Sequence, residues 1–295
     1  MVTAVGKDTW LEVDGLRIHC FEAGESGSPV MLLHGGGVDS AHLSWGRVIG
    51  PLSDHHRVFA PDFPGYGQSD KPDIKYTMDF YITFLAHLLD KLHLERLSLI
   101  GLSMGGGIAL GFALRYPERV EKLVLVAPYG ILDKVAAHKW GYLLVHIPYL
   151  DELSNWLLSS SRSIVRWTLL SALIYSPQRL SPELLEEVYQ EAHKPGAGKA
   201  FISFQRDEVF WNGLRSNYID RLHEITAPTL LISGSNDVAV PLNQIQRAHE
   251  LIKGSELYIM QECKHWAPGE KPEEFSRVVL EFLDRGSDVG NVFRS

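Results

Sequence analysis

Residues 101–105 read GLSMG, which fits the pattern G-x-S-x-G. An apolar run at residues 96–100 predicts a strand before it, and residues 104–116 predict a helix after it. In that context the serine occupies a sharp turn that exposes its hydroxyl, and the glycines admit close backbone neighbours. Ser103 is therefore the candidate nucleophile. The alternative, a phosphate-binding glycine turn, is less favoured because the chain has no G-x-G-x-x-G.

A serine hydroxyl is a poor nucleophile until a base takes its proton, and histidine has a pKa suited to that task. His265 is the best placed of the 13 histidines, because it follows the last expected strand in an irregular segment. Ligand chemistry lies at the carboxyl ends of parallel strands, so His265 is expected to reach Ser103. A catalytic Cys263 beside His265 is a weaker alternative.

An acid must orient the histidine and stabilise its charged form. Asp237 follows another expected strand, in the segment LLISGSNDVAVP. Two alternatives stay open. Asp237 is an ordinary turn residue, since Gly, Ser, Asn and Asp are common in turns, or Asp133 is the acid. Ser103, Asp237 and His265 form the preferred catalytic set.

Negative charge that develops on an attacked carbonyl oxygen needs N–H donors aimed at it. The Met104 N–H is one candidate, because it lies at the start of the expected helix. The other is the Gly36 N–H in the HGGG segment at 34–37, where bare backbone lets a donor approach the substrate. No motif calls for a metal or an organic cofactor, and none is expected.

Alternating strand and helix patterns must position these groups. Residues 10–22 predict a hairpin around Asp14-Gly15, and residues 77–92 have the apolar spacing of a helix. Continuous apolar runs such as PVMLL and EKLVLV predict strands that are buried on both faces. The whole pattern predicts an α/β fold with a mostly parallel, doubly wound sheet.

This alternation stops between about residues 131 and 222, which contain helical patterns, prolines and many aromatic residues but no convincing buried strand. It resumes at APTLLISGSND and ends in an amphipathic helix. The predicted organisation is an α/β core formed by residues 1–130 and 223–295, interrupted by a helical cap at residues 131–222. The aromatic residues of the cap either line an apolar pocket or pack the cap onto the core.

The chain has 295 residues and a formal net charge of −8, with no cluster of Lys and Arg. Nucleic acids and membranes are therefore not expected partners. Cys20 and Cys263 are far apart and lack metal-ligand spacing, which is typical of free thiols in a reducing compartment. The N-terminal segment lacks a secretion-signal pattern, so a cytoplasmic protein is expected.

Six segments together resemble the α/β-hydrolase superfamily: LLHGGG, APDFPGYGQSDKP, LIGLSMGGGIAL, RYPERVEKLVLVAP, LLISGSNDVAVP and KHWAPGEKPEEF. The resemblance implies the α/β-hydrolase fold with an inserted cap, and the order Ser103, Asp237, His265 is the order of that family. It also implies that Asp62–Ser69, with the family's D-x-P-G-x-G-x-S pattern, is a structural turn.

Within the superfamily the chain is similar to two groups of enzymes. Small carboxylesterases share the pattern G-x-S-M-G-G and a central cap. Meta-cleavage-product hydrolases, which split carbon–carbon bonds in ring-fission dienoates, share the glycines after HG and the pair His265-Trp266. The chain departs from the second group at Val38, where a proline is usual, and at Trp45, where an asparagine is usual.

These departures favour a serine esterase, acting on small to medium apolar or aryl esters through an acyl-enzyme, over a carbon–carbon hydrolase. A ligand receptor that keeps the triad is a third interpretation. The expected partner is a small-molecule ester or a related carbonyl compound, and the expected pocket residues are Gly35, Trp45 and Trp266. A carbon–carbon hydrolase would need a cation for its substrate's carboxylate, and the cap offers four arginines, Arg162, Arg166, Arg179 and Arg206.

Overall fold

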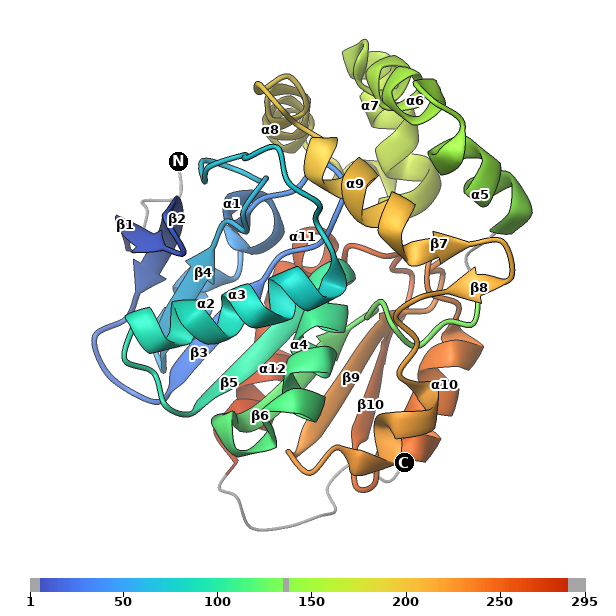
Figure 1. Cartoon of the computed structure of the whole chain (residues 1–295). Helices are drawn as coiled ribbons and strands as arrows, with labels where there is room; N and C mark the ends of the chain where they lie inside the picture. The colour runs from blue at the N-terminus through green and yellow to red at the C-terminus, as the bar shows by residue number, and fades with distance from the viewer. Residues whose placement is uncertain (1–5, 135–137, 286–295) are drawn as a thin grey trace.

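An eight-stranded sheet forms the centre of the computed structural model, which describes residues 6–134 and 138–285 (Figure 1). Its strands lie in the order β1-β2-β4-β3-β5-β6-β9-β10. β1 and β2 form an antiparallel hairpin, β2 is antiparallel to β4, and the other neighbouring pairs are parallel. The strands span Lys7–Val13 (β1), Leu16–Ala23 (β2), Pro29–Leu33 (β3), Arg57–Pro61 (β4), Leu97–Leu102 (β5), Val120–Val126 (β6), Thr229–Gly234 (β9) and Glu256–Met260 (β10). The predicted α/β fold with a mostly parallel sheet is confirmed.

Helices cover both faces of this sheet. Those of the core are α1 (Ala41–Trp45), α2 (Ile49–Ser53), α3 (Met78–Lys91), α4 (Met104–Arg115), α10 (Leu242–Leu251), α11 (Ala267–Glu270) and α12 (Pro272–Leu283), with the short η1 (Pro117–Arg119) and η4 (Ile219–Glu224). In β3, Met31 and Leu33 join the apolar layer formed with α3, α4 and α10. Val30 and Leu32 join the opposite layer, formed with α1, α2 and α12. Strands buried on both faces explain why the sequence contains continuous apolar runs.

Helix α3 illustrates how local sequence sets the ends of an element. The Thr77 side chain accepts a hydrogen bond from the Phe80 N–H at 3.0 Å, which caps the first turn. Lys91 occupies the last turn, where its charge interacts favourably with the helix dipole. Apolar residues at helical spacing, such as Tyr81 and Leu85, are fully buried against the sheet layer.

Helices α5–α9 lie between β6 and β9 along the chain, and Figure 1 shows them grouped beyond one end of the sheet. They span His138–His146 (α5), Leu150–Ser159 (α6), Arg162–Thr168 (α7), Pro182–Ala192 (α8) and Lys199–Glu208 (α9), with η2 (Leu169–Leu173) and η3 (Pro177–Arg179) between them. All fall inside the segment 131–222, and the division of the chain into core and cap at these boundaries stays a prediction. None of the helices in the described ranges is both long and apolar enough to span a bilayer.

One small element in this segment escaped the sequence analysis. β7 (Val209–Phe210) and β8 (Gly213–Leu214) pair as a short antiparallel hairpin, where no strand is predicted. Two residues in each strand are too few to produce a periodic pattern, so the sequence contains no signal for them.

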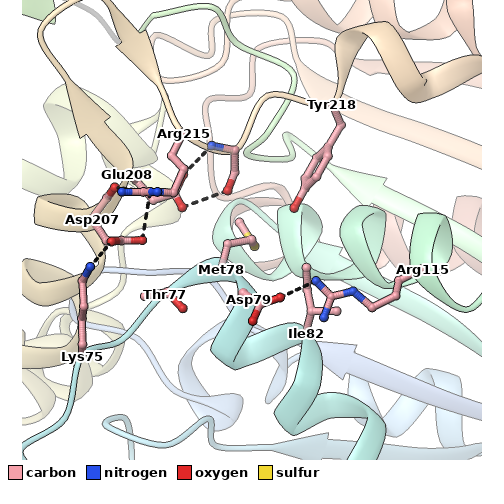
Figure 2. Close-up of a pocket in the computed structure, with 11 residues that line it drawn as sticks. Lys75, Thr77, Met78, Asp79, Ile82, Arg115, Asp207, Glu208, Arg215 and Tyr218 are labelled. Atoms are coloured by element: carbon pink, nitrogen blue, oxygen red, sulfur yellow. Dashed lines mark hydrogen bonds and ion pairs between the residues drawn. The ribbon is translucent and has the colours of Figure 1, made fainter.

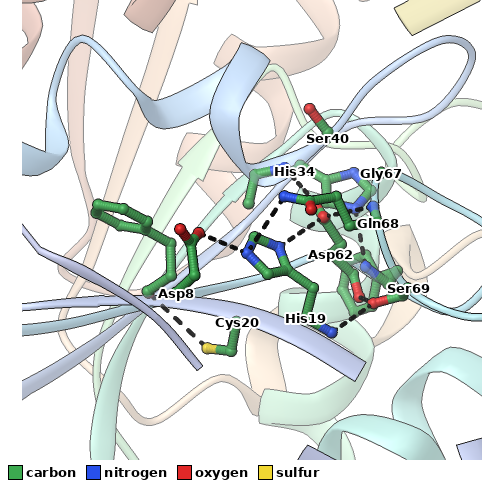
Figure 3. Close-up of polar contacts among 12 residues, drawn as sticks. Asp8, His19, Cys20, His34, Ser40, Asp62, Gly67, Gln68 and Ser69 are labelled. Carbon is green, nitrogen blue, oxygen red and sulfur yellow. Dashed lines mark hydrogen bonds and ion pairs between the residues drawn. The ribbon is translucent and has the colours of Figure 1, made fainter. Parts of the chain in front are cut away.

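A buried polar network joins the amino-terminal hairpin to the turn after β4 (Figure 3). The Asp62 carboxylate accepts hydrogen bonds from the Ala41 N–H and the Gln68 N–H, each at 2.8 Å. It also lies 2.9 Å from His19 Nδ1, while His19 Nε2 lies 2.7 Å from an Asp8 oxygen. Asp62 thus fixes the turn that follows it and the start of α1. The role of this carboxylate in the described structure is to hold the turn.

Two opposing effects set the pKa of His19. Burial lowers it, but hydrogen bonds and the charges of Asp62 and Asp8 raise it more, so that the pKa lies above its usual value. A pKa raised on folding means that the charged ring contributes stability below the unfolded pKa, near 6.5, and that this contribution is lost as pH rises through the folded pKa.

We therefore predict that His19→Gln destabilises the protein more at pH 6 than at pH 9. The expected loss at pH 6 is about 1–3 kcal/mol in the free energy of unfolding, because a buried charge-assisted pair is removed. Urea unfolding at both pH values measures it. His87→Gln serves as control, because His87 pairs with Asp14 at an exposed site. An equal loss at the two pH values would contradict the assignment.

Candidate active site

Ser103 lies in the turn between β5 and α4 in a backbone conformation that non-glycine residues rarely adopt, with φ 51° and ψ −115°. Its N–H donates to the Val126 carbonyl at 2.9 Å. Its own carbonyl accepts from the Gly107 N–H at 3.0 Å and from the Tyr129 N–H at 2.8 Å. Contacts to β6, to α4 and to the segment after β6 thus hold the strained residue in place.

The two glycines of the turn allow backbone segments to approach where a side chain would collide. A Cβ atom at Gly101 would lie 2.4 Å from the Gly105 carbonyl oxygen, and one at Gly105 would lie 2.2 Å from the Leu33 carbonyl oxygen. The expectation that both positions need bare backbone is confirmed. Because Leu33 ends β3, the same approach sets the start of α4 against the neighbouring strand.

His265 and Asp237 meet at the carboxyl ends of β10 and β9. His265 Nδ1 lies 2.8 Å from Asp237 Oδ2, and the Asp237 side chain is completely buried. Asp237 Oδ1 accepts from the Ala239 N–H at 2.7 Å and from the Val240 N–H at 3.0 Å. This carboxylate is therefore held as an acceptor for Nδ1–H, which leaves Nε2 of the ring unprotonated and able to act as a base.

The two alternatives to this set lie elsewhere. Asp133 is exposed and binds the Asn217 amide at 2.9 Å and the Arg247 guanidinium at 3.2 Å, so it does not orient the histidine. Cys263 is fully buried, and burial raises the pKa of its thiol. A buried neutral thiol is a poor nucleophile.

A cavity of about 510 Å³ lies between the sheet and the cap, and both Ser103 and His265 line it. Gly35 and Trp266 line it as well, together with apolar cap residues that include Leu144, Leu158, Val165, Leu169, Leu173 and Val188. Trp45 does not. It is completely buried in the core, where its ring packs against Phe275 with centroids 6.2 Å apart, so its assignment to the pocket is wrong. Helix α1 directs this side chain toward α12, which sequence alone does not reveal.

None of the four cap arginines lines the cavity. Arg162 pairs with Glu186 at 2.6 Å, Arg179 with Glu270 at 3.0 Å and Arg206 with Glu152 at 2.9 Å, whereas Arg166 is exposed on α7. Among the described residues that line the cavity there is no Lys or Arg. A substrate carboxylate would meet only neutral donors there.

His34, the first residue of the HGGG segment, holds the peptide between Gly35 and Gly36. The Phe63 N–H donates to His34 Nε2 at 3.0 Å, which places the ring proton on Nδ1. That Nδ1–H donates to the Gly35 carbonyl at 2.8 Å. In a trans peptide the C=O and N–H point in opposite directions, so this bond also sets the direction of the Gly36 N–H.

Asp39 supports the same loop and was missed by the sequence analysis. Its carboxylate accepts from the Gly35 N–H at 2.8 Å, the Ser44 hydroxyl at 2.7 Å and the Ser40 N–H at 2.7 Å. Burial raises its pKa, although these hydrogen bonds and the nearby His34 counteract the effect. An acid four residues after the first glycine of HGGG was the available signal.

Glu270 connects the histidine loop to the cap. Its completely buried carboxylate accepts from the Lys264 N–H at 3.0 Å and the Tyr175 N–H at 2.9 Å, and it pairs with Arg179. The Trp266 N–H donates to the Leu173 carbonyl at 3.1 Å. The position of His265 therefore depends on how the cap packs.

A second cavity, of about 390 Å³, lies beside α3 and α4 and is lined mainly by polar residues (Figure 2). Asp207 pairs with Lys75 at 2.5 Å and with Arg215 at 3.3 Å, and Asp79 pairs with Arg115. These charges neutralise one another, and neither Ser103 nor His265 lines this cavity. Ser103, Gly36 and His265 line the first cavity instead.

Residues 29–272 match the family described as alpha/beta hydrolase fold. The chain belongs to this family. The hydrolase is 33% identical to a 2-hydroxy-6-oxo-2,4-heptadienoate hydrolase of Pseudomonas putida, over 91% of this chain and 93% of that one. It is 34% identical to a 2-hydroxy-6-oxo-6-phenylhexa-2,4-dienoate hydrolase of Comamonas testosteroni, over 92% and 93% of the two chains. A meta-cleavage product hydrolase from Pseudomonas fluorescens matches its structure with a TM-score of 0.78 and 30% identity, over 95% and 98%.

The similarity corrects the ranking of activities drawn from the sequence. Ester hydrolysis was placed first because of two departures, Val38 and Trp45. Two relatives that are 33% and 34% identical to the hydrolase over more than nine-tenths of its length are named as dienoate hydrolases, so that ranking was wrong and the carbon–carbon alternative is the better supported one. One position in the glycine loop, Val38, and one buried in α1, Trp45, carried too much weight against the rest of the chain.

For the proposed triad, we predict that Asp237→Asn lowers kcat by about 10⁴-fold with little loss of stability. The amide no longer fixes the Nδ1–H tautomer of His265, and the base is lost. Steady-state kinetics of purified variants measure the change, with Asp133→Asn as the matched control. A comparable loss in the control would show that Asp237 has no special role.

For the glycine loop, we predict that Asp39→Asn lowers kcat by about 10- to 100-fold and leaves KM nearly unchanged. The amide can no longer accept all three hydrogen bonds, so the oxyanion donor at Gly36 loses its fixed direction. Asp14→Asn, an exposed change of the same kind, is the control. A change in KM alone would assign Asp39 to ground-state binding instead.

Proposed function

We propose that this hydrolase cleaves a carbon–carbon bond in 2-hydroxy-6-oxo-2,4-dienoates, the products of aromatic ring fission. The observation that carries the proposal is the identity of 33–34% with two dienoate hydrolases over more than nine-tenths of each chain. The arrangement of Ser103, His265 and Asp237 at an apolar cavity supports it.

The dienol first ketonises: its 2-hydroxyl proton moves to C5, the carbon next to the 6-oxo carbonyl, which leaves a 2,6-dioxo-3-enoate. Ser103 attacks the 6-oxo carbon while His265 takes the hydroxyl proton of the serine, and the N–H groups of Gly36 and Met104 stabilise the oxyanion. When the carbonyl re-forms, the C5–C6 bond breaks and its electron pair delocalises through the alkene onto the 2-oxo oxygen, which gives a dienolate. The His265 imidazolium returns a proton to that enolate oxygen. Water, deprotonated by His265, then releases the acyl group as a carboxylic acid.

The residues that line the cavity indicate where the group on the 6-oxo carbon and the carboxylate of the substrate would bind. The cap side is lined by leucine and valine side chains such as Leu144, Leu158 and Val165, which suits an alkyl or aryl group on the 6-oxo carbon. The carboxylate has no cation in the described lining, so the neutral donors available to it include the Gln205 amide and the Ser154 hydroxyl. We expect its binding to depend only weakly on ionic strength.

The direct test follows the loss of dienolate absorbance with the 6-methyl and the 6-phenyl substrates. Wild-type protein is expected to turn over both, with the lower KM for the phenyl compound, because the apolar side of the cavity buries the larger group. Ser103→Ala is expected to lower kcat by at least about 10³-fold while keeping the wild-type melting temperature. Efficient hydrolysis of p-nitrophenyl esters without any dienoate turnover would overturn the proposal.

A further inference from the structure

The outer surface of the cap leaves large apolar side chains in solvent. On α6, Leu150, Leu153 and Leu157 recur at intervals of three and four residues, which places them on one face of the helix. Leu153 is 50% exposed and the neighbouring Trp156 is 63% exposed. An amphipathic helix normally packs such a face against a core, and in the described structure no element covers it.

The helices on either side of α6 also leave large aromatic side chains exposed. Trp140 of α5 is 76% exposed, Trp167 of α7 is 64% exposed, and Tyr149 before α6 is 80% exposed. Helix α6 contacts both α5 and α7, and Figure 1 shows the three helices side by side at the outer end of the cap. We call this set the cap apolar surface: Trp140, Ile147, Tyr149, Leu150, Leu153, Trp156, Leu157 and Trp167.

The charges at this surface are unlike those of the rest of the chain. Lys139 and Arg166 are the sequence neighbours of Trp140 and Trp167 and are exposed. Neither has an ion-pair partner among the described residues, and the Lys139 ammonium lies over the Trp211 ring, 5.5 Å from its centroid. The acidic side chains of α6 leave no unpaired negative charge at this surface, because Asp151 is buried and Glu152 pairs with Arg206. Free positive charge beside the tryptophans therefore contrasts with the net charge of −8 of the whole chain.

The same helices line the catalytic cavity on their other side. Ser154 and Leu158 of α6, with Val165 and Thr168 of α7, line the cavity that contains Ser103. Leu158 is also 41% exposed, so the cap apolar surface and the cavity lining meet at this residue. The two sides of α6 are therefore joined through one side chain.

Against the expectation drawn from the net charge of the whole chain, we propose that the cap apolar surface docks on an anionic phospholipid bilayer. Tryptophan and tyrosine rings are suited to the depth of lipid headgroups, and Lys139 and Arg166 complement acidic headgroups. A second copy of the chain is a poorer occupant, because a two-fold contact through this surface would bring the free cations of both copies together. In the docked state, α6 and α7 lie between the bilayer and the cavity that contains Ser103.

The experiment measures flotation of the full-length protein with vesicles of phosphatidylcholine, with and without one-third phosphatidylglycerol. Wild-type protein is expected to bind the anionic vesicles, and binding is expected to shift its tryptophan emission to shorter wavelength. At 1 M NaCl the binding is expected to be at least about tenfold weaker than at low salt. Trp140→Ser/Trp156→Ser/Trp167→Ser is expected to bind at least about tenfold more weakly. Ile74→Ser/Leu251→Ser, which changes exposed apolar residues of the core, is the matched control and is expected to bind as wild type.

A second pair of variants tests whether the positive charges contribute to vesicle binding. Lys139→Glu/Arg166→Glu is expected to remove the preference for anionic vesicles, whereas Lys91→Glu/Lys253→Glu, an equal change of net charge on exposed core lysines, is expected to retain it. All variants should keep wild-type turnover of a water-soluble substrate. Failure of the wild type to bind either vesicle overturns the proposal. Light scattering tests the other occupant. If the wild type is a dimer that does not bind vesicles, and the triple serine variant is a monomer, the surface binds a second copy of the chain instead.

Discussion

The close contact between the start of α4, the end of β5 and the end of β3 is the constraint on which the rest of the site depends. Gly101 and Gly105 let three backbone segments meet at distances that a Cβ would prevent. The strained conformation of Ser103 is a consequence of that contact, and hydrogen bonds to Val126 and Tyr129 maintain it. The serine hydroxyl is thus presented by backbone packing, before any catalytic partner acts on it.

Four carboxylates hold the segments around this turn in position. Asp62 holds the start of α1, Asp39 holds the glycine loop, Asp237 holds the histidine ring and Glu270 joins the histidine loop to the cap. Each accepts several hydrogen bonds, mainly from backbone N–H groups, which compensates the loss of hydration that burial imposes. Replacing any of these acids would leave N–H groups unsatisfied as well as remove a charge. Backbone hydrogen bonds therefore hold each of these acids in place, and one of them, Asp237, also contacts His265, the candidate base.

The two sides of the cap contact different surroundings. Its inner side supplies the apolar walls of the cavity, and Phe201 of α9 lies so close to Gly36 that a Cβ there would be 2.4 Å from the ring. Its outer side leaves tryptophans and leucines in solvent. A cap that only closed the cavity would not need that second face, which is why we assign it a partner of its own.

The sequence by itself determined the fold and the candidate catalytic set. Strands buried on both faces produce continuous apolar runs, and a nucleophile turn needs glycines at fixed spacing, so both leave local patterns that Ser103 and its neighbours display. The tertiary structure decided what depends on contacts between distant segments. It showed that Trp45 packs against Phe275, that Asp39 supports Gly35, that the cap arginines do not reach the cavity, and that apolar residues on α6 remain uncovered. Direction and exposure of a side chain follow from packing between elements, and no local pattern encodes them.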